Sequence, residues 1–93
     1  MNTRRITATI WPADDDRTVE IRLNFQYVDV HLHEEYRTAL TEAFLKCGYS
    51  LPALTQFFQS IVYIPRHHMR TIRERIAAES DIELKWHDLT RRR

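Results

Sequence analysis

Apolar and polar side chains alternate in two stretches near the beginning of the chain, as they do in half-buried β-strands. The first stretch covers residues 6–11, and Pro12 with the acidic run behind it predicts that this strand ends in a solvated loop. The second stretch alternates clearly from Val19 to Tyr27 and then shifts its phase by one residue. The shift predicts a β-bulge near Tyr27 and Val28 in a strand that continues to about residue 33, or a strand buried on both faces at that end.

The next stretch changes to the spacing of a helix. Apolar side chains between residues 34 and 47 fall on one helical stripe. Glu34 and Glu35 stand in the first turn and Lys46 in the last, which suits the helix dipole at both ends. Gly48 is the only glycine of the chain and lies just past the expected end of the helix. This pattern predicts a helix over residues 34–47.

A second helix is predicted directly after a short turn. Ser50 is a favoured residue at a helix start, Pro52 is tolerated in a first turn, and the apolar positions that follow repeat at helical spacing. We therefore expect a helix over residues 50–62. Residues 59–64 are also rich in β-branched side chains, so an edge strand is the alternative for that part.

The last third predicts one more helix and one more strand. Pro65 ends the preceding element and can open a helix, in which Met69, Ile72 and Ile76 form a narrow apolar stripe. Alternation returns at residues 82–87 and predicts the final strand. The expected fold class is α+β with the order β-β-α-α-α-β. We expect a mainly antiparallel three-stranded sheet with the helices packed on one face.

Length and charge make this picture more specific. A chain of 93 residues is expected to form one small domain, residues 1–93, with residues 90–93 as a mobile basic tail. The net charge is only +1, but residues 66–93 carry eight basic and five acidic side chains. We see no signal peptide and no apolar run of membrane-spanning length, so a cytoplasmic protein without a membrane partner is expected.

The motifs of the common enzyme classes are missing from the sequence. A chain with one glycine has no glycine-rich phosphate loop, no serine stands in a nucleophile elbow, and the single cysteine lies on an apolar helix stripe. We therefore expect a protein that is not an enzyme and that uses no cofactor.

Binding of another macromolecule is the function that these exclusions favour, and a protein is the expected partner. Trp, Tyr and Arg side chains are enriched at interface hot spots. The candidate residues here are Trp11, Tyr63, Arg66, Arg70 and Arg73. A small sheet with exposed edge strands can also pair into a homodimer. The expected type of protein is an inhibitor, an immunity protein or an accessory factor.

DNA binding is the alternative function. Residues 35–62 would form a helix-turn-helix, in which Gln56 and Gln59 face the bases. Arg66, Arg70 and Arg73 would then contact phosphates. The absence of Lys and Arg between Cys47 and Pro65 weighs against this alternative, because phosphate contacts supply much of the affinity.

A histidine metal site is a second alternative. His31 and His33 would lie on the same side of the predicted strand, because alternate strand residues share a face. Zinc would need further ligands from elsewhere in the chain, and no paired-cysteine or helical histidine motif supplies them. No metal is therefore expected.

Overall fold

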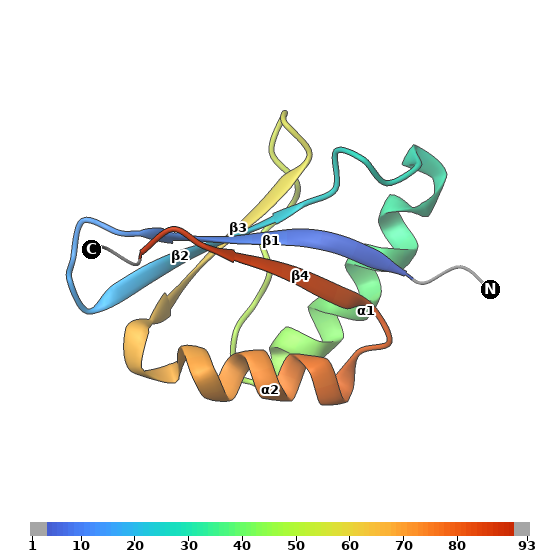
Figure 1. Ribbon diagram of the computed structural model, residues 1–93. Helices are drawn as coiled ribbons and strands as arrows, with labels where there is room; N and C mark the ends of the chain where they lie inside the picture. The colour runs from blue at the N-terminus through green and yellow to red at the C-terminus, as the bar shows by residue number, and fades with distance from the viewer. Residues whose placement is uncertain (1–3, 91–93) are drawn as a thin grey trace.

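A computed structural model describes residues 4–90 as a four-stranded sheet with two α-helices on one of its faces (Figure 1). The strand order across the sheet is β3-β2-β1-β4. A short 3-10 turn precedes each α-helix. The elements in chain order are β1 (Arg5–Pro12), β2 (Thr18–Asn24), η1 (Val30–Leu32), α1 (His33–Lys46), β3 (Gln59–Pro65), η2 (Arg66–His68), α2 (Met69–Glu79) and β4 (Glu83–Asp88).

The first two strands form where the alternation predicted them. β1 and β2 pair in an antiparallel register that sets Ile10 opposite Ile21 and Trp11 opposite Glu20. Apolar residues at alternate positions are buried on the side of the helices, and the residues between them, which are polar apart from Trp11 and Pro12, face the open side. The predicted strand at residues 6–11, its end at Pro12 and the first half of the second strand are therefore confirmed.

The predicted continuation of the second strand past residue 24 is wrong. The Asn24 side-chain oxygen accepts a hydrogen bond from the Gln26 backbone N–H at 2.8 Å, and the Val28 N–H donates to the Phe25 carbonyl at 3.0 Å. These bonds close a turn that takes the chain out of the sheet. Residues 28–32 then run through an irregular segment and the η1 turn, so there is no β-bulge. The phase shift in the sequence marks this departure.

α1 is the helix that the apolar stripe predicted. Tyr36, Leu40, Ala43 and Phe44 form its buried face. Gly48 has φ of 93°, a left-handed conformation that side chains disfavour, and it ends the helix as expected.

The predicted second helix is absent, and β3 takes its place. Residues 51–55 have no regular structure, residues 56–58 form a turn, and the strand starts at Gln59. Ser60, Val62 and Ile64 are buried at alternating positions, so the period is that of a strand. The β-branched residues fit a place beside β2, and Pro65 falls at the strand end, where it interrupts no ladder. The edge-strand alternative for residues 59–64 was the correct one.

The loop before β3 is fixed to the rest of the molecule. The Pro52 carbonyl accepts hydrogen bonds from Arg37 Nη2 of α1 and from Ser60 Oγ of β3, both at 2.9 Å. Leu51 is buried in the hydrophobic core. The loop is thus held between α1 and β3.

The expected α+β class is confirmed, and the finer topology is different. The described residues hold two α-helices, and the element order is β-β-α-β-α-β. The sheet is mixed, because β4 pairs parallel to β1 while the other neighbours are antiparallel. The helix predicted after Pro65 is confirmed as α2, and the predicted final strand is confirmed as β4. Of the basic tail predicted at residues 90–93, residues 91–93 lie outside the described residues.

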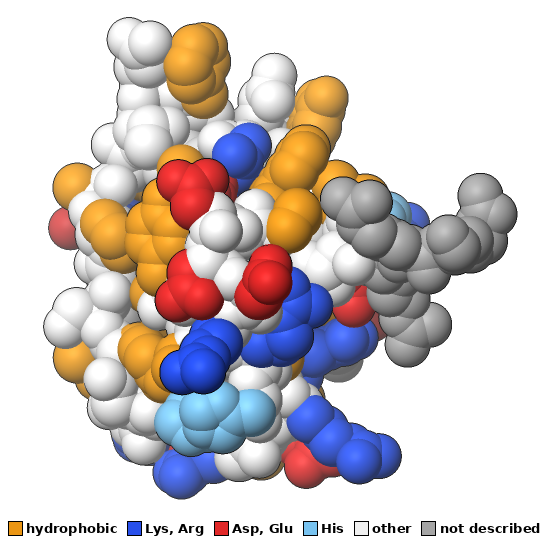
Figure 2. All heavy atoms as spheres, turned by 90° about the vertical axis from the view of Figure 1, so that its left-hand side faces the viewer, with side chains coloured by type: hydrophobic (Ala, Val, Ile, Leu, Met, Phe, Trp, Pro, Cys, Tyr) orange, Lys and Arg blue, Asp and Glu red, His pale blue; other side chains and the backbone are white. Residues whose placement is uncertain are grey.

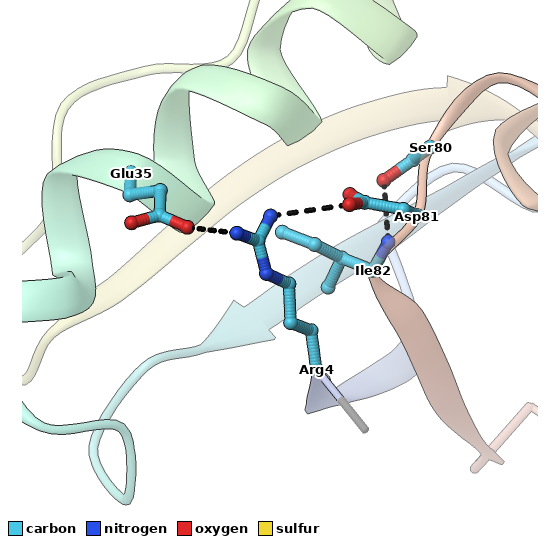
Figure 3. Close-up of polar contacts among 5 residues, drawn as sticks. All are labelled: Arg4, Glu35, Ser80, Asp81 and Ile82. Atoms are coloured by element: carbon cyan, nitrogen blue, oxygen red, sulfur yellow. Dashed lines mark hydrogen bonds and ion pairs between the residues drawn. The ribbon is translucent and has the colours of Figure 1, made fainter. Parts of the chain in front are cut away.

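Arg4 joins three segments at the beginning of the sheet (Figure 3). Its guanidinium forms ion pairs with Glu35 of α1 and with Asp81 in the turn between α2 and β4. In the same turn the Ser80 hydroxyl accepts a hydrogen bond from the Ile82 N–H at 3.0 Å. These contacts fix the point at which the chain enters β4.

Neither of the two α-helices within residues 4–90 is both long enough and apolar enough to cross a membrane.

Candidate protein-binding surface

Exposed apolar side chains gather on two loops at one end of the sheet. Tyr27 is 87% exposed, Val30 74%, Phe57 66% and Phe58 44%. We name the surface formed by Tyr27, Val30, Phe57 and Phe58 the aromatic loop surface. Figure 1 shows the loop around residues 55–58 in yellow, protruding beyond the strands at the top of the view. Large apolar side chains held in solvent on loops are typical of interaction sites.

Thr55 builds the turn that presents the two phenylalanines. Its carbonyl accepts from the Phe58 N–H at 2.9 Å, and its own N–H donates to the Gln59 carbonyl at 2.8 Å. Its side-chain hydroxyl also accepts from the Phe57 and Gln59 N–H groups, at 3.2 and 3.3 Å. Four hydrogen bonds from one residue give this loop a defined shape.

Phe58 has a strained backbone. Its φ is 59°, in the left-handed region, where a bulky side chain is rare. Such strain costs on the order of 1–3 kcal/mol and is found most often at functional sites. The conformation turns the chain so that Phe57 and Phe58 stand on the exposed side of the turn while Gln59 begins the strand.

The two loops are connected to each other. The Phe25 N–H donates to the Phe58 carbonyl at 2.9 Å. The His33 ring lies edge-on between the rings of Phe25 and Phe58, at 5.9 and 5.5 Å between centroids. His33 Nε2 also lies 2.8 Å from the Val28 carbonyl oxygen. The two loops that carry the aromatic loop surface are therefore joined by a backbone hydrogen bond and by the His33 ring.

The structure divides the predicted protein-binding residues between two sides of the molecule. Trp11 and Tyr63 lie on the open face of the sheet, on either side of Glu20 in the strand register. Trp11 is half-buried, and the Arg22 guanidinium lies over its ring at 4.5 Å while it pairs with Glu20. Tyr63 is 59% exposed. Trp11 and Tyr63 therefore share a face, but neither is part of the aromatic loop surface.

The three candidate arginines lie on the opposite side, along η2 and α2. Arg66 Nε donates to the Asp16 carbonyl at 2.8 Å, so it binds the β1–β2 turn. Arg73 lies over the Trp86 ring at 5.0 Å. Arg70 is almost fully exposed, with Glu74 4.0 Å away. Figure 2 faces this end of the molecule and, among the side chains of residues 4–90, shows acidic groups beside the basic ones.

The helix-turn-helix predicted for residues 35–62 does not exist. Gln56 lies in the turn and Gln59 is the first residue of β3, so neither stands on a helix. The recognition helix that the DNA-binding alternative requires is missing, because the chain after Gly48 forms a loop and an edge strand.

The strand that was expected to align His31 and His33 is also absent. His31 lies in η1 and His33 begins α1. Within residues 4–90 no group of three or more His, Cys, Asp or Glu side chains is placed to hold a metal ion.

Sequence reasoning missed the members of the aromatic loop surface. The alternation predicts that Tyr27 lies on a strand face, and the helical spacing after Pro52 places Phe57 on the apolar stripe of the predicted second helix. A usable signal was present in the β-branched run of residues 61–64, which favours a strand and leaves Thr55 to Phe58 as its turn.

No family model matches this chain, and the comparisons with curated proteins and with solved structures gave no match.

Proposed function

We propose that this chain is a non-enzymatic interaction protein that binds another protein through the aromatic loop surface. The observation that carries the proposal is the pair of connected loops that hold Tyr27, Val30, Phe57 and Phe58 in solvent. Exposed aromatic side chains on a rigid support are typical hot-spot residues.

The charge of the two loops favours a protein over a nucleic acid. Residues 25–33 and 53–58 contain no Lys and no Arg. Binding to phosphate groups would need such side chains close to the contact. An apolar surface without basic residues is better suited to an apolar cleft on a protein.

The shape of the surface indicates what the partner must offer. Phe57 is exposed in the turn before β3, and this turn protrudes in Figure 1, so the partner needs a concave apolar pocket. The hydrogen bonds of Thr55 fix the turn before binding. A loop that is ordered in advance loses less entropy on binding, which improves affinity.

Comparative capture from the native cell extract tests the proposal. The bait is the wild-type chain, the Tyr27→Ser and Phe57→Ser double variant, or a Leu45→Ser control. Leu45 is 54% exposed on α1 and is not part of the aromatic loop surface, so the control removes an exposed apolar side chain elsewhere. We expect one protein to be retained by wild type and by the control at equal levels and to be lost with the double variant.

Direct contact is then measured with a photo-crosslinking amino acid at Phe57 and, as the control, at Leu45. Crosslinking to the retained protein from Phe57 alone supports the proposal. A partner that the double variant retains at the wild-type level, or no specific partner at all, contradicts it.

A further inference from the structure

β4 is an edge strand, and among residues 4–90 β1 is the only strand that pairs with it. The Glu83 N–H donates to the Arg4 carbonyl and the Leu89 N–H to the Ile10 carbonyl, both at 2.8 Å. Strand residues alternate the side to which their backbone groups point. Residues 83, 85 and 87 therefore bond to β1, and the backbone groups of Leu84 and Trp86 point away from it.

The helix side of this edge is incompletely covered. A groove of about 480 Å³ runs along α2 and β4, and its apolar walls come from Ile76, Ala77, Ile82, Leu84 and Trp86. Leu84 and Trp86 are only half-buried, whereas the corresponding apolar positions of the other three strands are buried. An added strand would give the edge its hydrogen-bond partners and cover these side chains.

We propose that the free edge of β4 pairs with β4 of a second copy of this chain, antiparallel, with the two Leu84 residues opposite each other on the two-fold axis. In this register Leu84 exchanges backbone hydrogen bonds with its counterpart, and Ile82 lies opposite Trp86 of the other copy. Glu83 lies opposite Lys85 of the other copy on the open face, twice by symmetry.

The charges of β4 select this register. Residues that lie opposite each other point to the same face of the sheet. The register can therefore shift only by two residues at a time, because a shift of one residue would exchange the faces. A shift in one direction sets Lys85 against Lys85, and a shift in the other sets Glu83 against Glu83. Like charges directly opposite each other are destabilising, and opposite charges are stabilising. Only the Leu84-centred register pairs every Glu83 with a Lys85.

The same sequence feature favours a second copy over an unrelated peptide. When a second copy of Glu83, Leu84 and Lys85 runs antiparallel to the first, each Glu83 meets a Lys85 and the two leucines meet each other. A two-fold interface requires such self-complementarity. Arg4 and the Ser80 hydroxyl hold the start of β4 in place, so the strand is fixed before it pairs. The pairing would join two sheets into one eight-stranded sheet with both α2 helices on one face.

This dimer is independent of the proposed function. β3 and β4 are the opposite edges of the sheet, and the aromatic loop surface lies where the loops flank β2 and β3. The dimer would leave two such surfaces free.

The first test uses charge variants and solution mass. Wild-type protein is expected to have twice the 11.2 kDa mass of the chain in light scattering at high concentration. Glu83→Lys and Lys85→Glu each set like charges against each other twice, so each variant alone is expected to be monomeric. An equimolar mixture of the two variants restores both opposite-charge pairs and is expected to recover the dimer mass. Circular dichroism shows that each variant is folded.

The second test locates the axis by disulfide formation in a Cys47→Ser background. Leu84→Cys is expected to form a crosslinked dimer on oxidation, because directly opposite residues lie within disulfide reach. Lys85→Cys is the matched control and is expected to remain uncrosslinked. A monomer at every concentration, a dimer that neither charge variant weakens, or crosslinking through Lys85→Cys rather than Leu84→Cys overturns the proposal.

Discussion

The two edges of the sheet are built from similar alternating strands and end in different states. On β3, Ser60, Val62 and Ile64 are buried and the preceding loop is hydrogen-bonded to the strand. On β4, none of the residues is buried, and a groove borders Leu84 and Trp86. The length of the chain segment next to an edge strand therefore decides whether the apolar side chains of that strand are covered.

Chain length on the helix side explains the difference. Twelve residues, 47–58, separate α1 from β3. This segment is long enough to cover the helix side of β3 and to place Leu51 in the hydrophobic core. Only residues 80–82 separate α2 from β4. So short a turn leaves no chain to cover the second edge. Pro65 also removes one N–H from β3, whereas β4 contains no proline.

The largest contrast between the edges is expected from truncating one apolar residue on each. Ile64→Ala should lower the free energy of unfolding by about 3 kcal/mol, because Ile64 is fully buried. Leu84→Ala should lower it by only about 1 kcal/mol, because Leu84 is half-buried. Urea unfolding at high dilution, where any dimer is dissociated, gives both values. Equal losses would contradict the difference between the edges.

The closure of the β3 edge is tested at Ser60. Ser60→Ala removes the hydrogen bond to the Pro52 carbonyl and should lower the free energy of unfolding by about 1 kcal/mol. Arg37→Met removes the other donor to the same carbonyl. The double variant leaves that carbonyl without either partner, so its loss should exceed the sum of the single losses by about 0.5 kcal/mol or more. Strict additivity in urea unfolding would show that the two bonds act independently.

The strained turn at the start of β3 is expected to reverse the usual order of alanine and glycine. Phe58→Gly should be more stable than Phe58→Ala by about 1 kcal/mol, because glycine adopts the left-handed conformation freely. Both variants lose the contact with His33, so that contact cancels in the comparison. Thermal or urea unfolding of the matched pair decides the matter. An alanine variant as stable as the glycine variant would mean that the turn relaxes.

The smallest effect is expected from the exposed ion pair between β1 and β4. Arg5 Nε lies 3.1 Å from Glu83 Oε1, and each of the two side chains is more than half exposed. Arg5→Gln should change the free energy of unfolding by less than about 0.5 kcal/mol. Added salt should remove the difference. A larger loss would mean that this pair, rather than the backbone ladder and Leu84, holds β4 to the sheet.

The candidate binding surface was much less predictable than the strands and helices around it. Tyr27 and Phe57 are apolar residues in apolar patterns, so periodicity assigns them to the core. Their exposure follows from two turns, one closed by the Asn24 side chain and one by Thr55. Short polar residues such as Asn24 and Thr55 are only weak predictors of such turns, because these residue types also occur within strands and at helix starts.

Local patterns in the sequence are enough to predict the α+β class, β1, α1 with its glycine end, α2 and β4, because each of these elements has a strong local period and clear end signals. The tertiary structure decided the rest. Residues 59–62 fit a helix and a strand almost equally, and the open side of β2 selected the strand. The parallel pairing of β4 with β1 joins residues that are far apart in the chain, such as Ile6 and Leu84. Local periodicity carries no information about such a partner, so only the complete sheet could settle it.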